Sequence, residues 1–352
     1  MDQSDISSAL QQRVLHALEN KTQLTIKAGG SKAFLGQLVE GEAIEVSQHR
    51  GIIEYDPREL VITARSGTPL SEIENALAKS NQMLAFEPPH FGEHATLGGT
   101  IACALSGPRR PYSGSARDFV LGCKLLNGRG EIASFGGQVM KNVAGYDVSR
   151  LVTGAQGTLG IQLEISLKVL PRPAASITVS HECSEPGAIA SMCGLLSKPY
   201  PVDGACYDGE RCHVRISGSA QAVKEARKKI PGDVMNDAKS FWQNLREHEL
   251  PYFHHKSRLY RIAVKPATKP LHIDGLWLLD WGGAQRWLYS DEDIATIRHQ
   301  VELAGGHVTV FRGGDDEIFQ PLPSAMMALH QRLKSSFDPA NIFNRGRLYA
   351  NL

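Results

Sequence analysis

Three glycine clusters in the first half of the chain constrain its fold most. They occupy residues 28–33, 96–102 and 154–161, where a predicted strand ends, a predicted helix begins and a predicted strand starts. Glycine lets the backbone approach a ligand and adopt positive φ, and amides exposed in such turns can hold a diphosphate. For each cluster the alternative is a tight turn or a close contact between elements. Each cluster could hold a ligand through backbone groups, and the residues alone leave both interpretations open.

A fourth glycine pair resembles a dinucleotide-binding motif but does not fit one. Gly128 and Gly130 match the spacing G-x-G-x-x-A, with Ala133 as the last residue. That motif requires a helix to begin at the glycines. Here Asn127 and Gly128 predict a hairpin turn, followed by a strand over residues 132–135. The chain also lacks the G-x-x-x-x-G-K-[ST] phosphate loop, so a Rossmann or P-loop enzyme is excluded.

Composition narrows the class of protein further. The 352 residues carry a net charge of +1, which argues against a broad nucleic-acid-binding surface. Six cysteines contain no C-x-x-C pair, so we expect a reducing compartment and no iron–sulfur or zinc site in this chain. There is no signal peptide pattern and no apolar run of ~18 residues. We therefore expect a cytoplasmic protein, which could attach peripherally to the inner membrane through a partner.

The pattern of predicted elements changes at Pro171-Arg172-Pro173, which we interpret as a domain boundary. We expect a first domain over residues 1–173, a second over 174–322, and a helix and tail over 323–352 that return to the first. In the first domain we predict helices at 5–19, 69–79, 96–106 and 146–152, and strands at 24–28, 44–46, 60–65, 118–126, 132–135 and 161–170. Beyond the boundary we predict strands at 176–181, 202–207, 213–217, 259–264, 276–281 and 307–311, and helices at 188–196, 220–229, 236–247, 291–304 and 325–336. This alternation predicts one or two ferredoxin-like units, with an antiparallel sheet and helices on one face.

Several short motifs occur in a fixed order along the chain. Besides the three glycine clusters they are Asp56-Pro57-Arg58 through Gly67, Glu87-Pro88-Pro89, Tyr112 through Val120, Asn142-Val143-Ala144-Gly145-Tyr146-Asp147, and Asp338-Pro339 with Phe343-Asn344-Arg345-Gly346-Arg347. This order resembles the FAD-binding oxidoreductases of the vanillyl-alcohol oxidase and p-cresol methylhydroxylase type. Among them, the flavin subunits of glycolate oxidase complexes are similar to this chain at Pro108 through Gly114, Val139 through Asp147 and Asp280 through Ala284. The resemblance implies an α+β fold with a two-subdomain FAD domain and a smaller ferredoxin-like cap domain.

The resemblance also implies cofactor contacts, carried over by position. The FAD diphosphate would lie against Ala28, Gly29, Gly30, Ser31, Lys32 and Ala33, with Pro88 near the adenine or diphosphate end. The flavin and ribityl chain would meet Thr96, Gly98, Gly99 and Thr100, with Ser106, Gly107, Gly114 and Ser115 alongside. Gly157 and Ile161 would touch the cofactor through backbone atoms, and Asn344 would approach from the tail.

Two departures from the family pattern change what we expect. The loop at residues 28–33 has no histidine, so FAD should be bound non-covalently. Related 2-hydroxy-acid dehydrogenases carry a histidine-rich metal motif in the cap, and the comparable residues 307–316 lack its ligands. We therefore expect no metal site and assign no catalytic residue. Arg109 and Arg110 could hold a substrate carboxylate, an FAD phosphate or a partner chain. For His90 and His94 a hydrogen-bonding or surface role is favoured.

The resemblance implies that the chain works with partners. These would be a second, catalytic FAD-binding subunit and an iron–sulfur subunit, acting on a small 2-hydroxy acid such as glycolate or D-lactate. Since the metal motif is absent, we expect the hydride step mainly on the sister subunit, with this chain relaying electrons. Two alternatives stay open: a self-sufficient FAD-dependent 2-hydroxy-acid dehydrogenase, and a structural subunit with little chemistry of its own.

Overall fold

The computed structural model describes residues 5–137, 146–314 and 317–352, which form two compact units. The first unit comprises residues up to 105, residues 115–171 and residues 321–352; the second comprises residues 106–114 and 172–320. The two units change at residues 171/172 and 320/321, each two residues before the boundary that the sequence predicted. The segment 106–114 differs from the expectation, because its contacts are with the second unit. The Asn142–Gly145 motif lies outside the described residues.

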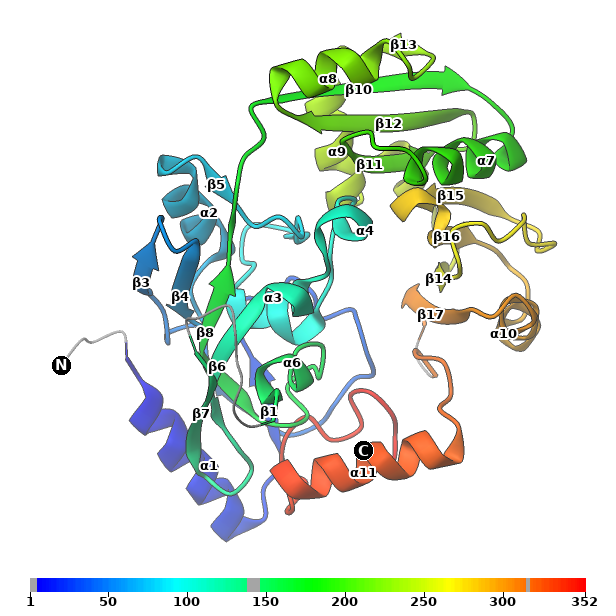
Figure 1. Ribbon diagram of the computed structural model, residues 1–352. Helices are drawn as coiled ribbons and strands as arrows, with labels where there is room; N and C mark the ends of the chain where they lie inside the picture. Colours follow the sequence, from blue (N-terminus) through cyan, green and yellow to red (C-terminus); the bar gives the residue numbers. More distant parts are fainter. Residues whose placement is uncertain (1–4, 138–145, 315–316) are drawn as a thin grey trace. The chain divides into compact units, whose positions relative to one another are not determined.

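The first unit contains three sheets, of which the pair β5-β9 is the smallest, and the helices that pack on them (Figure 1). A parallel pair joins β1 (Leu24–Lys27) to β2 (Glu42–Glu45). A five-stranded antiparallel sheet has the order β3-β4-β8-β6-β7. Its strands are β3 (Ile52–Asp56), β4 (Val61–Arg65), β6 (Val120–Leu126), β7 (Ile132–Gly136) and β8 (Ile161–Lys168). The remaining elements are α1 (Ser7–Asn20), α2 (Leu70–Lys79), β5 (Gln82–Met83), α3 (Leu97–Cys103), α5 (Ala116–Phe119), α6 (Val148–Leu151), β9 (Leu170–Pro171) and α11 (Ser324–Phe337).

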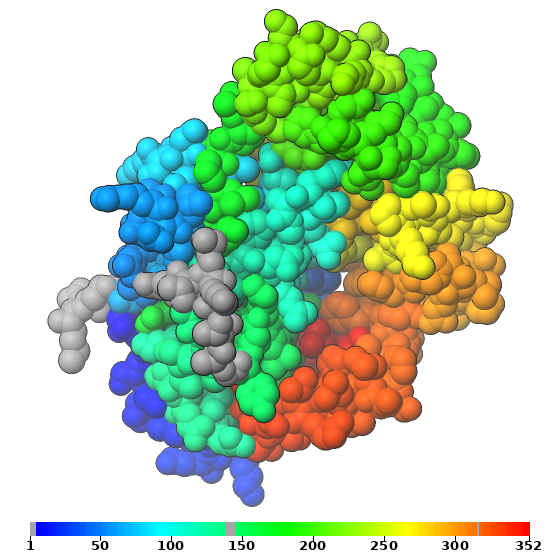
Figure 2. All heavy atoms as spheres, in the orientation of Figure 1, coloured from blue at the N-terminus to red at the C-terminus, as the bar shows by residue number. Residues whose placement is uncertain are grey.

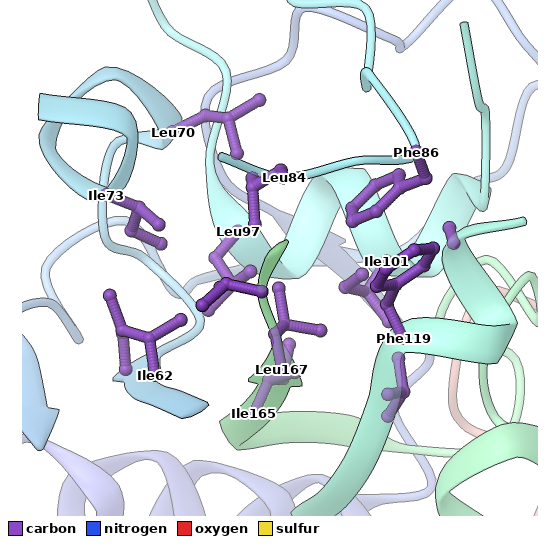
Figure 3. Packing of buried hydrophobic residues seen from close by; sticks show 14 of the residues in the cluster. Ile62, Leu70, Ile73, Leu84, Phe86, Leu97, Ile101, Phe119, Ile165 and Leu167 are labelled. Atoms are coloured by element: carbon purple, nitrogen blue, oxygen red, sulfur yellow. The ribbon is translucent and has the colours of Figure 1, made fainter. Parts of the chain in front are cut away.

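One apolar core joins α2 and α3 to the five-stranded sheet (Figure 3). Leu70 and Ile73 of α2 are fully buried, as helical spacing of three residues on one face requires. They pack with residues of α3, β4 and β8, and the rings of Phe86 and Phe119 lie 5.5 Å apart. Burial of these side chains fixes α3 on the sheet, and α3 carries the second glycine cluster.

The hairpin at residues 127–130 is confirmed, and with it the exclusion of a Rossmann motif. Leu126 pairs with Ile132 across antiparallel strands β6 and β7. The Asn127 side chain accepts hydrogen bonds from the amides of Arg129 and Glu131, which closes the turn. A strand, and not a helix, therefore follows these glycines.

Segments from the first 24 residues and from the tail pack together in the first unit. Phe343 forms a parallel bridge with Leu24 of β1, and both are buried with Leu10 and Val14 of α1. Figure 2 shows the blue N-terminal and red C-terminal residues on the same face of this unit. The tail thereby becomes a third strand-like neighbour of the small parallel pair.

The second unit is built on one eight-stranded sheet, with the order β13-β10-β12-β11-β15-β16-β14-β17. Its first half runs β-α-β-β-α-β along the chain, which is the order of a ferredoxin-like unit. The elements of that half are β10 (Ala175–Glu182), α7 (Glu185–Leu196), β11 (Val202–Tyr207), β12 (Arg211–Gly218), α8 (Ala220–Arg227) and β13 (Asp233–Val234). The others are α4 (Arg110–Ser113), α9 (Ala238–Glu247), η1 (Pro251–His254), β14 (Leu259–Ala263), β15 (Leu276–Asp280), η2 (Trp281–Gly283), β16 (Gln285–Tyr289), α10 (Ile294–Leu303) and β17 (His307–Arg312).

Helices cover both faces of this sheet, and not one face as the sequence predicted. Val179 of β10 packs in the apolar cluster with α7 and α8. The adjacent Thr178, which points to the opposite face, accepts a hydrogen bond from the indole of Trp242 on α9. Strand β16 was also missed, because its fully buried Arg286 breaks the apolar alternation. In the part of the chain that the structure describes, no helix is both long and apolar enough to span a membrane.

Candidate cofactor site

A cavity of about 480 Å³ lies within the first unit. It is bounded by the end of β1 and the loop after it, by the start of α3, by residues 152–162 and by the tail. Twelve residues predicted to bind the cofactor line it: Ala28, Gly29, Gly30, Ser31, Lys32, Ala33, Thr96, Gly98, Gly99, Gly157, Ile161 and Asn344. All three glycine clusters therefore meet at one cavity.

Six other predicted residues do not line this cavity. Thr100 is fully buried inside α3, and Pro88 is buried in the segment before it. Ser115 is the N-cap of α5, where its hydroxyl and amide both donate to the Asp118 carboxylate. The remaining three, Ser106, Gly107 and Gly114, belong to the second unit. Motif order alone did not reveal that this segment packs with the other unit.

The loop after β1 requires glycine for two different reasons. A Cβ on Gly29 would lie 1.5 Å from the carbonyl oxygen of His94, so only glycine fits there. Gly30 has a φ of +70°, and a Cβ added to it would meet no atom within 4 Å, so its backbone faces open space. Lys32 is buried and donates to the carbonyl oxygen of His90 at 3.2 Å. This contact ties the loop to the segment that contains Pro88.

The second cluster forms a tight start to α3. The Thr96 hydroxyl accepts a hydrogen bond from the amide of Gly99 at 3.2 Å, so it acts as the N-cap. A Cβ on Gly98 would lie 2.6 Å from the Cβ of Ser66. The expected alternative, a close contact between elements that only glycine permits, is therefore present here together with the cavity lining.

The tail supplies cavity residues through long-range hydrogen bonds. Asn344 is buried; its amide nitrogen donates to the Gln156 carbonyl at 2.7 Å, and its amide oxygen accepts from the Ile26 amide at 2.9 Å. One side chain thus joins β1 to the third glycine cluster. Asn344 itself was predicted from the resemblance, but Gln156 was missed.

Arg347 also lines the cavity, although it was not among the predicted site residues. Its guanidinium donates to the Gln156 side chain at 3.2 Å, and to the carbonyl oxygens of Ala33, Leu35 and Gln37. These acceptors belong to the third glycine cluster, to the last residue of the first cluster and to the residues that follow it. Arg347 ends the tail motif quoted for the resemblance, but no feature of that motif predicts these hydrogen bonds.

A buried ion pair holds the tail in place. Lys334 of α11 donates to the Asp338 carboxylate and to the carbonyls of Thr158 and Phe343, each at 2.7 Å. Burial lowers the pKa of Lys334, and the charge of Asp338 opposes that shift. Asp338 in turn accepts from the amides of Ile342 and Phe343. The pair thereby connects α11, the third glycine cluster and the tail.

Several polar atoms at the cavity have no partner within the described residues. They are the hydroxyls of Thr25 and Ser66 and the side-chain nitrogen of Gln162, all buried. Burying such groups without a hydrogen bond costs on the order of 1–3 kcal/mol each, so a polar ligand would satisfy them. Burial also raises the pKa of the Cys103 thiol, which lines the same cavity and is therefore neutral.

Other residues singled out in the sequence lie elsewhere. Arg109 forms an ion pair with Asp203, which also pairs with Arg215 at 2.8 Å. His90 contacts Glu74 at 3.1 Å, in agreement with a hydrogen-bonding role. Tyr146, in the described part of the motif at residues 142–147, is 92% exposed. Within residues 5–137, 146–314 and 317–352 no group of three or more His, Cys, Asp or Glu residues could hold a metal ion.

Comparison with known proteins identifies relatives of the whole chain. Residues 7–136 match the model of an FAD binding domain. Over 348 residues the chain is 48% identical to glycolate oxidase subunit GlcE of Escherichia coli K12, covering 99% of both proteins. It is also 32% identical over 141 residues to glycolate oxidase subunit GlcD of Bacillus subtilis, covering 40% of this chain and 30% of that protein.

Solved structures agree on the fold. An alkyldihydroxyacetonephosphate synthase covers 96% of this chain, with a TM-score of 0.67 at 14% identity, and the chain covers 74% of that protein. At this identity the likeness concerns the fold alone. The predicted fold class and family resemblance are confirmed, and FAD is the cofactor. The glycine-lined cavity with its unpaired polar atoms fits that cofactor.

Proposed function

Because the chain belongs to the family of glycolate oxidase subunit GlcE, we propose that it is the FAD-binding subunit of a multi-subunit complex that oxidises glycolate to its 2-oxo acid. D-lactate is proposed as a second substrate of the complex, since 164 residues of the chain are 32% identical to a D-lactate dehydrogenase of Anaerostipes hadrus. The observation that carries the proposal is the cavity where all three glycine clusters and the tail meet.

We propose that the loop at residues 28–33 holds the FAD diphosphate non-covalently. Gly30 leaves room for the diphosphate, and Lys32 places a positive charge beside it. Gly98 and Gly99 would lie along the flavin and ribityl chain, while Gly157 and Asn344 close the cavity from the other side. When bound, FAD would supply a two-electron acceptor that can also release single electrons.

The proposed role of FAD also leads us to propose two kinds of partner subunit. Electrons that leave a flavin singly need a one-electron acceptor, and the cysteines Cys103, Cys123, Cys183, Cys193, Cys206 and Cys212 do not form a cluster-binding group. We propose an iron–sulfur subunit as that acceptor. The cap residues 307–314 show no metal ligand set, which supports a sister flavoprotein subunit as the main site of hydride transfer.

The experiment is to purify the chain alone and record its visible spectrum before and after anaerobic addition of glycolate or D-lactate. The proposal expects a flavin band that denaturation releases from the protein and that neither acid bleaches. Bleaching by substrate would instead support a self-sufficient dehydrogenase and contradict the proposed division of labour. A colourless chain that takes up no added FAD would point to a structural subunit.

A further inference from the structure

The segment at residues 33–39 borders the cofactor cavity and lies outside any helix or strand. Leu35 is buried, but Leu38, which lines the cavity, is 92% exposed. Apolar packing therefore holds the first half of the segment and not the second. The position of the segment depends on polar contacts as well, and these come from the tail.

The side chain and the backbone of Arg347 both bind this segment. Its Nη1 donates to the carbonyl oxygen of Gln37 at 2.9 Å, and its Nη2 donates to those of Ala33, at 3.0 Å, and Leu35. The Gln37 amide in turn donates to the carbonyl oxygen of Arg347 at 2.9 Å. One residue of the tail thus holds three carbonyl groups of the segment in a fixed arrangement.

Gly36 lets the segment lie directly against the Arg347 side chain. A Cβ on Gly36, whose φ is +90°, would lie 2.5 Å from the side-chain oxygen of Gln156 and 3.0 Å from Nε of Arg347. That Nε donates to the same oxygen of Gln156 at 3.2 Å. The guanidinium is therefore packed too closely to reorient unless the segment moves with it.

Within the described part of the chain, the positive charge of Arg347 has no carboxylate partner. Its hydrogen bonds there all go to neutral oxygens, and no carboxylate of those residues lies within 4.0 Å of its guanidinium. Burial lowers the pKa of Arg347, because the loss of water disfavours the charged form. A guanidinium stays protonated in proteins, so an anion in the cavity would offset this cost.

Lys32 and Arg347 act on the same part of the cavity. Burial raises the pKa of the Cys103 thiol, and the charges of Lys32 and Arg347 both oppose that rise. Glu45, which also lines the cavity, lies opposite Lys27 across β2 and β1, and both are exposed. Among the described residues, Lys32 and Arg347 therefore give the lining an excess of positive charge, which favours an anionic ligand.

We propose that Arg347 binds the FAD diphosphate together with Lys32, and thereby couples cofactor binding to the position of the segment at residues 33–39. A guanidinium has five N–H donors, and the four hydrogen bonds of Arg347 leave one Nη1 proton for a phosphate oxygen. Lys32 supplies a point charge from the loop, whereas Arg347 supplies a donor of fixed direction from the tail. The inference rests on the proposed placement of the diphosphate at residues 28–33, and it adds a residue and a segment that were not among the predicted contacts.

Arg347→Gln tests the contact, because it removes the charge. Fluorescence titration of the apoprotein with FAD should show binding at least about tenfold weaker than that of the wild type. The ratio of the two affinities should shrink as salt is raised from about 0.05 M to about 0.5 M, since ions screen the attraction between opposite charges. Arg347→Lys should bind with intermediate strength, because it keeps the charge and loses the planar fork.

Arg345→Gln is the matched control. Arg345 carries the same charge in the same tail, but it is exposed and does not line the cavity, so this variant should bind FAD like the wild type. The inference is overturned if Arg347→Gln binds FAD like the wild type, if the affinity ratio does not change with salt, or if Arg347→Lys binds no better than Arg347→Gln. Either of the last two results would show that Arg347 acts only through the shape of the segment.

A second measurement uses the wild type alone, so it does not depend on how the variants fold. Hydrogen exchange of the Gln37 amide, which donates to the Arg347 carbonyl, should slow by about tenfold or more when FAD binds. Unchanged exchange in the FAD-loaded protein would contradict the coupling. A wild-type apoprotein that binds no FAD would instead contradict the proposed function, which separates the two failures.

Discussion

The cofactor cavity and the arginine–indole cluster of the second unit, formed by Arg110, Arg261 and Trp281, are built in different ways. The cavity is lined by consecutive residues, whose glycines Gly29, Gly30 and Gly98 expose backbone or permit close packing. The arginine–indole cluster instead combines single side chains, Arg261 and Arg110, from distant segments over one ring. A site made of backbone leaves a local pattern in the sequence, while side chains from distant segments leave no pattern that unites them.

The tail complicates this contrast, because it adds side-chain contacts to the backbone-built cavity. Lys334 and Asn344 each join segments that are more than 150 residues apart. If the cavity forms without these side chains, replacing them should change the stability of the protein little. If these side chains hold the cavity together, replacing them should lower the stability of the protein more than most surface substitutions do.

The largest effect is expected for Lys334→Met. It would leave the Asp338 carboxylate buried without its counter-charge and remove three hydrogen bonds. Breaking a buried pair from one side typically costs about 3–5 kcal/mol of unfolding free energy. Urea unfolding of the FAD-loaded protein measures this loss. Arg332→Met on the exposed side of the same helix is the control and should change stability by less than about 0.5 kcal/mol. Equal stability of the two variants would show that the tail is dispensable.

A smaller effect is expected for Asn344→Ala. The Ile26 amide and the Gln156 carbonyl would each lose a partner, at a cost of about 1–3 kcal/mol apiece. Asn344→Asp keeps the acceptor for Ile26 but places a buried negative charge against the Gln156 carbonyl, so it should be less stable than Asn344→Ala. Urea midpoints of the three proteins give the order. The reverse order for the two variants would contradict the assigned hydrogen bonds.

The smallest effect is expected for the pH dependence of stability that His248 of the second unit causes. Burial lowers the pKa of His248 well below 6.5, and its ring stacks on Phe253 at 3.9 Å. As pH falls below 6.5 the unfolded chain binds a proton that the folded chain does not, so stability decreases by up to about 1.4 kcal/mol per pH unit for this group. His248→Phe should therefore lose less stability than wild type between neutral pH and pH 5 in thermal unfolding. Other histidines with lowered pKa, His49, His181 and His307, remain in both proteins and cancel in the comparison. Parallel profiles would contradict a neutral buried His248.

Local patterns predicted much of the first unit. Thr96 before two glycines indicated a capped helix, and Asn127-Gly128 indicated the hairpin that excludes a Rossmann motif. These signals are short in range, because turn and cap geometry depend on residues two or three positions apart. The resemblance then placed the three glycine clusters at one cofactor.

The contacts that cross the sequence could not be predicted. Nothing near Arg347 indicates that it donates to the carbonyl of Ala33 at the end of the first glycine cluster, and Lys334 has the sequence context of an ordinary exposed helix residue. The segment 106–114 groups with the second unit, where the Trp281 indole donates to Gly107. Strand β16 escaped detection because Arg286 is buried through hydrogen bonds to carbonyls of a distant loop. Such partners are set by tertiary structure and not by spacing.

FAD binding by the loop at residues 28–33 is the central claim, and one pair of variants tests it. Gly30 and Gly305 have φ values of +70° and +73°, and an added Cβ meets no atom within 4 Å at either position. Valine at either should therefore cause a similar strain of about 1–2 kcal/mol. Fluorescence titration of the apoprotein with FAD should show that Gly305→Val binds like wild type, while Gly30→Val binds at least about tenfold more weakly because its side chain blocks the diphosphate. Equal FAD affinity of the two variants would contradict the placement of the cofactor in this cavity.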